Sequence, residues 1–188
     1  MKTNILMLLV LVVSCMHSFA QSMEKQTMID RNGTTSFFSV APLENIVAVN
    51  NQVLAAINLQ KGTVAVSMLM RGFRFKKTLM EEHFNENYVE SDKYPKATFQ
   101  GTIKDFTLLP FDQNGSFEAV VEGEVSLHGV TQPLSTEVQF TLTDKFVQAS
   151  TTFELVVADF EIKIPQLVVN NIAKKVEVQS RFNFSKKK

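Results

Sequence analysis

Cysteine is almost absent from this 188-residue sequence, in which Cys15 is the single example. The chain beyond it therefore has no disulfide, no thiolate nucleophile and no cysteine ligand for a metal. Tryptophan is missing and tyrosine occurs twice, whereas phenylalanine occurs 16 times. Phenylalanine offers a large apolar area without a polar atom that needs a partner. The domain must be stabilised by its hydrophobic core, and its phenylalanines can fill that core or line an oily cavity.

An excess of either charge is absent too, since 19 basic side chains face 19 acidic ones. This balance gives no electrostatic indication of nucleic acid or of an anionic membrane as a partner. The one charge run, Lys186–Lys188, is interpreted as a solvated tail. No linker, low-complexity stretch or internal repeat divides the chain, which predicts a single domain.

Long hydrophobic runs are limited to the N-terminus, where Lys2 precedes the apolar stretch from Ile5 to Val13. This stretch is too short for a helix that crosses a bilayer, which takes about 20 residues. With the small residues of Ser18-Phe19-Ala20 it predicts a signal peptide over residues 1–20, cleaved before a domain at 21–188. Val12–Cys15 also resembles a lipoprotein box, so lipidation of Cys15 stays open. Either route predicts export, to a periplasmic, secreted or lipid-anchored location.

Period-two alternation dominates the rest of the sequence. It is clearest at Leu134–Thr143, where every second residue is apolar or threonine, a pattern typical of a half-buried strand. Similar patterns predict further strands at Thr35–Val40, Val53–Leu59, Thr63–Met70, Ala97–Leu109, Phe117–Leu127, Phe146–Val157 and Val176–Phe184. Many strands with one apolar face favour a sandwich or a closed barrel.

Turn residues separate these strands, and one segment has a different period. Helical spacing over Thr78–Tyr88 predicts one short helix, with Thr78 and Glu81 as a capping box. Tight reversals are expected at Asn32-Gly33, Lys61-Gly62, Asp112–Gly115 and Thr143-Asp144. The close spacing of the strands implies antiparallel neighbours.

Residues for catalysis or metal binding are scarce. His83 and His128 lie far apart in sequence, and Glu81-Glu82-His83 lacks the second histidine that a zinc-binding helix needs. His83 is interpreted as a helix residue that packs locally. His128 is interpreted as a turn residue bonded to backbone, with a polar contact to a ligand as the alternative. No nucleophile elbow, phosphate loop or dinucleotide fingerprint is present, so we expect no enzyme activity, no metal and no cofactor.

Two blocks of sequence carry a family resemblance. Glu82–Tyr88 followed by Ser91–Gly101 resembles the central signature of the YceI-like family, and Gly123–Pro133 is similar to that family's strand and turn. A weaker match runs from Phe153 to Pro165. The physical interpretation of these blocks is architectural: Pro95 ends one element and starts another, and Gly129 permits a tight turn.

The resemblance implies an all-β fold, an extended antiparallel lipocalin-like β-barrel of about eight strands with one short helix. It also implies an exported protein without enzyme activity, whose interior tunnel binds a polyisoprenoid or another long amphiphile. The chain departs from the commoner family pattern around Asn32–Phe38, where a Trp and a His-Ser pair are often found. This departure concerns contacts to a ligand head group rather than the barrel.

The leading hypothesis is therefore an apolar cavity that holds an isoprenoid or lipid-like chain, with each buried CH2 contributing about 0.8 kcal/mol. The competing hypothesis is an envelope structural or interaction protein whose barrel is filled by its own side chains. A homodimer is left open. The candidate lining residues are Phe38, Phe75, Phe84, Tyr88, Phe99, Phe140, Phe153 and Phe182.

Overall fold

The computed structural model describes residues 27–40, 45–164 and 174–186. The predicted signal peptide, including Cys15, lies outside these ranges. Long antiparallel strands dominate the described part. They are β1 (Thr27–Ser39), β2 (Ile46–Asn58), β3 (Thr63–Leu69), β4 (Arg74–Phe75), β5 (Lys96–Ile103), β6 (Gly115–Leu127), β7 (Val130–Leu142), β8 (Phe146–Val156) and β9 (Lys175–Ser185).

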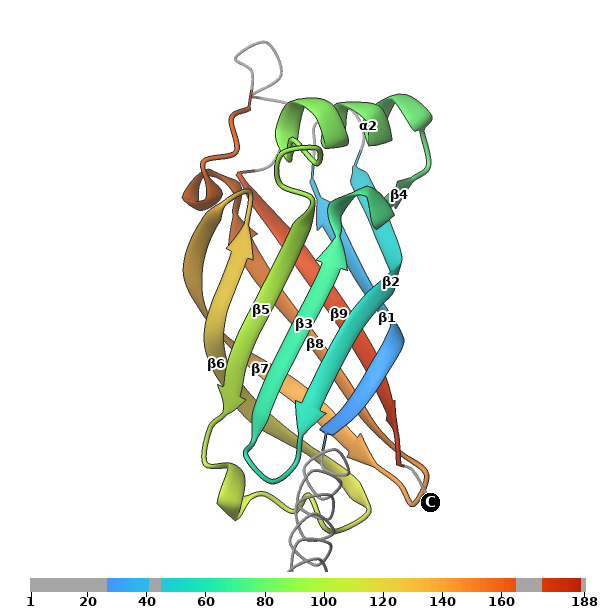
Figure 1. Ribbon diagram of the computed structural model, residues 1–188, viewed down its shortest axis with the longest axis vertical. Helices are drawn as coiled ribbons and strands as arrows, with labels where there is room; N and C mark the ends of the chain where they lie inside the picture. Colours follow the sequence, from blue (N-terminus) through green and yellow to red (C-terminus); the bar gives the residue numbers. More distant parts are fainter. Residues whose placement is uncertain (1–26, 41–44, 165–173, 187–188) are drawn as a thin grey trace, which may run out of the picture.

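Eight of these strands close into a ring. Around the ring the order is β1-β9-β8-β7-β6-β5-β3-β2, and pairing of β1 with β2 completes it, while the two-residue β4 pairs only with β2. The expected antiparallel barrel with one short helix is thereby confirmed. Figure 1 shows a tall barrel with α2 lying across one end, which we call the helical end. The β2–β3 turn lies at the opposite end.

Short helical segments occupy the loops. They are η1 (Met70–Gly72), α2 (Thr78–His83), η2 (Phe84–Tyr88), η3 (Phe106–Leu108) and η4 (Val157–Phe160). The helix predicted at Thr78–Tyr88 is present, with its second half wound as a π-turn. Its predicted capping box is wrong, because Thr78 is already helical. The Glu81 carboxylate instead accepts hydrogen bonds from Arg74 Nη1 at 2.8 Å and from the backbone N–H of Phe75 at 3.2 Å, which ties the helix to β4.

Two other expectations need correction. Asn32-Gly33 is not a reversal but lies inside β1, at an irregularity in the pairing with β2. Glycine is needed there for close approach, since an added Cβ would lie 2.5 Å from the ring of Phe182. The strand predicted at Ala97–Leu109 ends at Ile103, because Asp105 takes a left-handed conformation (φ 50°) and the chain turns into η3.

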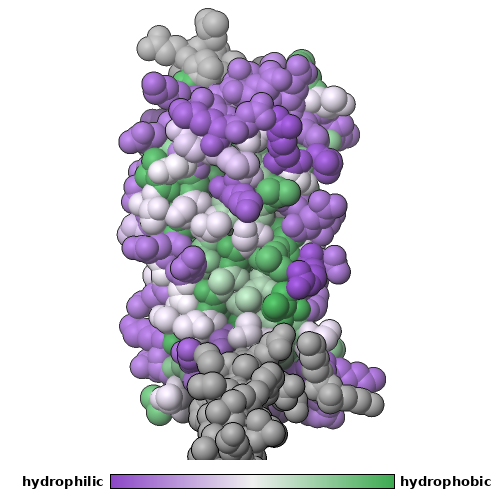
Figure 2. Space-filling model, in the orientation of Figure 1, coloured by the Kyte–Doolittle hydropathy of each residue, from purple (hydrophilic) through white to green (hydrophobic). Residues whose placement is uncertain are grey.

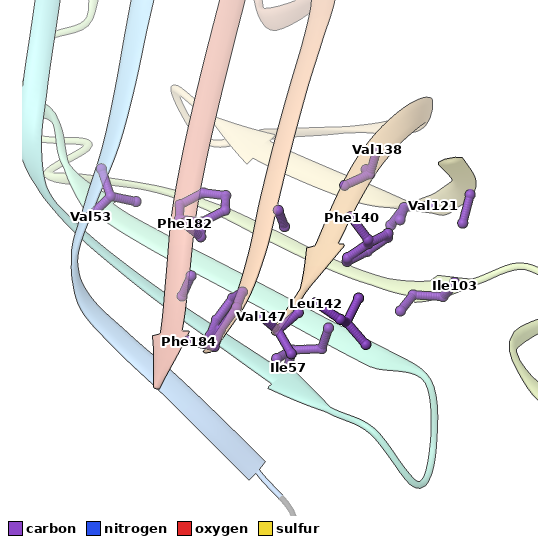
Figure 3. Close-up of a cluster of buried hydrophobic side chains, with 13 residues drawn as sticks. Val53, Ile57, Ile103, Val121, Val138, Phe140, Leu142, Val147, Phe182 and Phe184 are labelled. Carbon is purple, nitrogen blue, oxygen red and sulfur yellow. The ribbon is translucent and has the colours of Figure 1, made fainter. Parts of the chain in front are cut away.

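Among the described residues, two hydrophobic clusters lie in the barrel interior. The larger one, away from the helical end, includes Val53, Ile57, Phe140, Leu142 and Val147, each at most 2% exposed. Figure 3 shows these side chains converging from β2, β7 and β8 on the same interior space. Rings of the η3 region add to it, with Phe111 5.0 Å from Phe117 and 5.1 Å from Phe140 between ring centroids. This end of the barrel is therefore filled by its own side chains, and we call it the plug.

A buried carboxylate links β1 and β9 where their ladder stops. The two strands pair only from Thr34 to Phe38 on β1. Next to this stretch, Asp30 accepts a hydrogen bond at Oδ2 from the backbone N–H of Asn183 (2.7 Å) and at Oδ1 from that of Asn32 (2.9 Å). Asp30 thus takes the place of a backbone carbonyl and holds β1 to β9 beside the plug. We call this junction between β1 and β9 the seam.

The outer surface is polar around the helical end and more apolar over the middle of the face that carries β2 and β3 (Figure 2). Exposed apolar side chains on β1 and β2 include Ile29, Val47 and Leu54, which are 41–50% exposed. Within the described ranges, no helix is long and apolar enough to span a bilayer.

Candidate ligand cavity

A cavity of about 340 Å³ lies inside the barrel, between the plug and the helical end. Its volume falls within the range of small-molecule sites, roughly 300–1,000 Å³. Every strand of the ring contributes inward side chains to its wall, and α2 with η2 covers it from the end. The alternation of the strands explains this wall, because residues two apart share the inner face.

Burial changes along the barrel. On β7 the inward residues Val138 and Phe140 are 7% and 1% exposed, whereas Leu134 and Thr136, nearer the helical end, are only half-buried. Pairing of β7 with β8 ends at Val138–Thr151, so the remaining parts of these two strands are not joined by a ladder. The interior is packed at the plug and accessible toward the helical end.

Four phenylalanines form an aromatic cluster under the helix. Phe37 of β1 lies 5.5–5.8 Å from Phe73, Phe75 and Phe84 between ring centroids, and Phe75 lies 5.1 Å from Phe84. All four line the cavity. Such offset and edge-to-face contacts add about 0.5–1.5 kcal/mol each beyond burial of area. The cluster gives the cavity an aromatic roof.

Of the eight residues proposed from the sequence, all but one line this cavity: Phe75, Phe84, Tyr88, Phe99, Phe140, Phe153 and Phe182. Phe38 lies outside the lining. Period two places Thr35, Phe37 and Ser39 on the inner face of β1, so the adjacent Phe38 points the other way. Because Phe37 and Phe38 are neighbours of the same type, the residue pattern alone does not tell which of them faces inward.

The polar part of the lining consists of hydroxyl groups and one imidazole. Among the described residues that line the cavity there is no Asp, Glu, Lys or Arg. Hydroxyl groups come from Thr35, Ser39, Thr98, Thr136, Ser150, Thr151, Ser180 and Tyr88, and His83 contributes an exposed ring. Burial raises the pKa of the Tyr88 phenol above its ordinary value of 10.0, so this group remains a neutral hydrogen-bond donor. Serine and threonine are common on both faces of these strands, so no sequence signal singled out the hydroxyls that line the cavity.

His128 does not line the cavity. It occupies a turn with φ 53°, and its ring nitrogens lie 3.0 Å from the carbonyl oxygen of Phe160 and 2.9 Å from the carboxylate of Glu90. Its interpretation as a turn residue bonded to backbone is confirmed. The ring of Tyr94 packs against it at 4.4 Å, and against Gly129, whose φ is 80°. Through these contacts, the loop of Glu90 and Tyr94, the turn of His128 and the segment of Phe160 are held together at the helical end.

The described residues offer little for catalysis. No cluster of three or more His, Cys, Asp or Glu residues that could hold a metal occurs within the described ranges. The wall of the cavity offers apolar area and hydroxyl groups but no carboxylate pair for acid–base work. The arrangement is suited to enclosing an apolar molecule.

Comparison with known proteins decides the family. The profile of the YceI-like domain matches residues 23–184. The chain belongs to the YceI-like family. The family assignment made from the signature blocks is therefore confirmed, and the match includes residues of every strand of the barrel.

Solved structures agree with this YceI-like fold. A polyisoprenoid binding domain from Saccharophagus degradans superposes with a TM-score of 0.74 at 13% identity, covering 85% of this chain and 98% of that one. BcnA from Burkholderia cenocepacia gives 0.67 at 13% identity, covering 80% and 95%. The YceI protein of Campylobacter jejuni gives 0.62 at 11% identity, covering 79% and 90%. No curated protein matches the sequence.

Proposed function

We propose that this YceI-like protein is a non-catalytic binding protein that holds a polyisoprenoid or another lipid-like amphiphile inside its barrel. The observation that carries this proposal is the apolar cavity of about 340 Å³, whose described lining lacks Asp, Glu, Lys and Arg. The structural similarity to a polyisoprenoid binding domain supports the same ligand class.

Burial of apolar surface is the driving force for such binding. Ten methylene-sized groups entering the cavity contribute roughly 8 kcal/mol before costs. Association and ordering of the chain offset a large part of this, since lost motion alone costs about 4 kcal/mol or more. The net gain suits reversible holding of a lipid, and no polar chemistry is needed for it.

Export is the second part of the proposal. It rests on the N-terminal sequence, where Lys2, the apolar run and Ala20 suit a cleaved signal peptide, and Cys15 suits lipidation. Intact-mass measurement of the mature protein separates the outcomes. A mass that begins at Gln21 supports cleavage, an acylated Cys15 supports a lipid anchor, and an uncleaved chain contradicts export by either route.

The competing function is a structural or interaction protein of the cell envelope with a filled barrel. The plug fits that description, but the half-buried wall nearer the helical end does not. Native mass spectrometry of the protein purified from its own host tests the choice, followed by organic extraction. A co-purifying apolar mass supports the carrier. A protein that is empty, and that binds no added isoprenoid, contradicts it.

A substitution that fills the cavity tests the carrier function, and a substitution on the outer surface serves as its matched control. Val66 of β3 lines the cavity, opposite Ala55 and Phe99 on the neighbouring strands. Val66→Phe is expected to reduce the amount of ligand bound, because the larger phenyl ring occupies space in the cavity that the ligand needs. Leu54→Phe adds a ring at a position on β2 that is 41% exposed and outside the lining, and should leave binding unchanged.

A further inference from the structure

The inward face of β1 carries two hydroxyl groups that are almost fully buried. Thr35 and Ser39 are each 2% exposed, and both line the cavity on either side of Phe37. Thr35 lies next to Ser180 of β9, with 2.9 Å between the two hydroxyl oxygens. We call Thr35, Ser39 and Ser180 the hydroxyl strip. Apolar residues of β9, Val178 and Phe182, bracket it.

Two of the three hydroxyl hydrogens in this strip have no acceptor among the described residues. A hydroxyl carries one hydrogen to donate and two lone pairs. The bond between Thr35 and Ser180 uses one hydrogen, and no other acceptor for either group is found among the described residues. The buried Oγ of Ser39 has no hydrogen-bond partner at all in that part of the chain. The strip therefore presents two unmatched donors to the cavity.

Another hydroxyl pair of the cavity wall, Thr136 and Thr151, has an acceptor for each of its hydrogens. Thr151 donates to the carbonyl oxygen of Glu137 at 2.7 Å, and Thr136 lies 2.8 Å from Thr151. Both hydrogens of that pair have acceptors, so its role in joining β7 to β8 accounts for it. Because buried polar groups are almost always paired, the unmatched donors of the hydroxyl strip need a different explanation.

We propose that the hydroxyl strip binds an uncharged oxygen acceptor carried by the ligand, such as an alcohol, ether or carbonyl oxygen. The inference rests on the proposed carrier function and specifies its ligand class. An anionic group at this depth would lack a positive partner, because none of the described lining residues is Lys or Arg, and the ring of His83 is exposed whereas Thr35 and Ser39 are buried. Leaving a charge unpaired in such surroundings costs several kcal/mol. A pure hydrocarbon would leave both donors unmatched.

The test compares three probes with the same carbon skeleton: farnesene, farnesol and farnesoate. Affinities are measured on the full mature chain by displacement of a fluorescent apolar dye. The double variant Thr35→Val/Ser180→Ala removes the paired hydroxyls with little change in shape, and Ser39→Ala removes the single one. The matched control is Ser116→Ala/Thr141→Val, an exposed hydroxyl pair 2.9 Å apart on β6 and β7 and outside the cavity.

We expect the double variant to lose about two- to tenfold in affinity for farnesol, the value of one net hydrogen bond, and to bind farnesene at least as tightly as the unaltered protein does. Ser39→Ala should act in the same direction, and the control pair should change neither affinity. In the unaltered protein, farnesoate should bind more weakly than farnesol.

Two results would overturn the hydroxyl strip while leaving the carrier function intact. One is an unchanged farnesol affinity in both strip variants, and the other is an equal loss for farnesol and farnesene, which would indicate general damage to the cavity. Failure of the unaltered protein to bind any of the three probes would instead contradict the carrier function itself.

Discussion

The buried carboxylate of Asp30 offers the sharpest test of how this barrel closes. Asp30 is 8% exposed and accepts two backbone hydrogen bonds, of which the one from Asn183 joins β1 to β9 beyond the end of their ladder. Hydrogen bonds to charged groups contribute about 1.5–3 kcal/mol each. Asp30→Ala removes both, so we expect the free energy of unfolding to fall by about 3 kcal/mol or more. Asp30→Asn keeps one acceptor oxygen and should cost about half as much.

Urea unfolding followed by far-UV circular dichroism measures these losses. Asp144→Ala is the control, because Asp144 accepts a hydrogen bond from the exposed side chain of Asn114 (2.6 Å), and its loss should cost below about 0.5 kcal/mol. Amide hydrogen exchange at Asn183 should accelerate in Asp30→Ala. A loss no larger than that of Asp144→Ala, with unchanged exchange at Asn183, would refute this account of the seam.

Further predictions concern the plug, a strand contact and a cavity residue. Phe140→Ala should lower the free energy of unfolding by about 3–5 kcal/mol, and Phe146→Ala, at a position 37% exposed, by much less; equal losses in urea unfolding would contradict the plug. Gly123→Ala should lower the melting temperature, since its Cβ would collide with a backbone carbonyl of β5; an unchanged melting temperature would count against that contact. In Tyr94→Phe, the remaining Tyr88 should titrate at higher pH folded than in urea, by ultraviolet absorbance, because burial raises its pKa. The folded state favours the neutral phenol, so stability should fall as the pH rises above about 10; identical titrations would refute this.

Much of the barrel was predictable from the sequence because its information is local. The alternation at Leu134–Thr143 needs only side chains that point to opposite faces, and β7 (Val130–Leu142) bears it out. The turn at Lys61-Gly62 was also predicted, and Gly62 has a φ of 64°. Asn32-Gly33 has the same local chemistry, yet it lies within β1. There the glycine allows the close approach of the ring of Phe182, a residue distant in sequence.

How deeply each phenylalanine of the cavity wall is buried was beyond sequence reasoning for the same reason. Phe140 and Phe153 occur in similar alternating patterns, but the first is buried among other rings and the second is half-buried. The difference depends on where the η3 region folds against the barrel and where the β7–β8 ladder ends. Neither feature can be predicted from the residue pattern of a single strand.

By itself, the sequence determined that this protein is an all-β domain with an apolar inner face, that its part beyond Cys15 has no thiol chemistry, and that its signature blocks are those of a YceI-like barrel. Alternation, composition and motif spacing carry that information along the chain. Only the tertiary structure decided which inward residues leave a cavity, that Asp30 closes the seam, and that the hydroxyls of Thr35 and Ser39 are left with unmatched donors. These features depend on contacts between strands far apart in sequence, and on hydrogen-bond partners that exist only once the ring has closed.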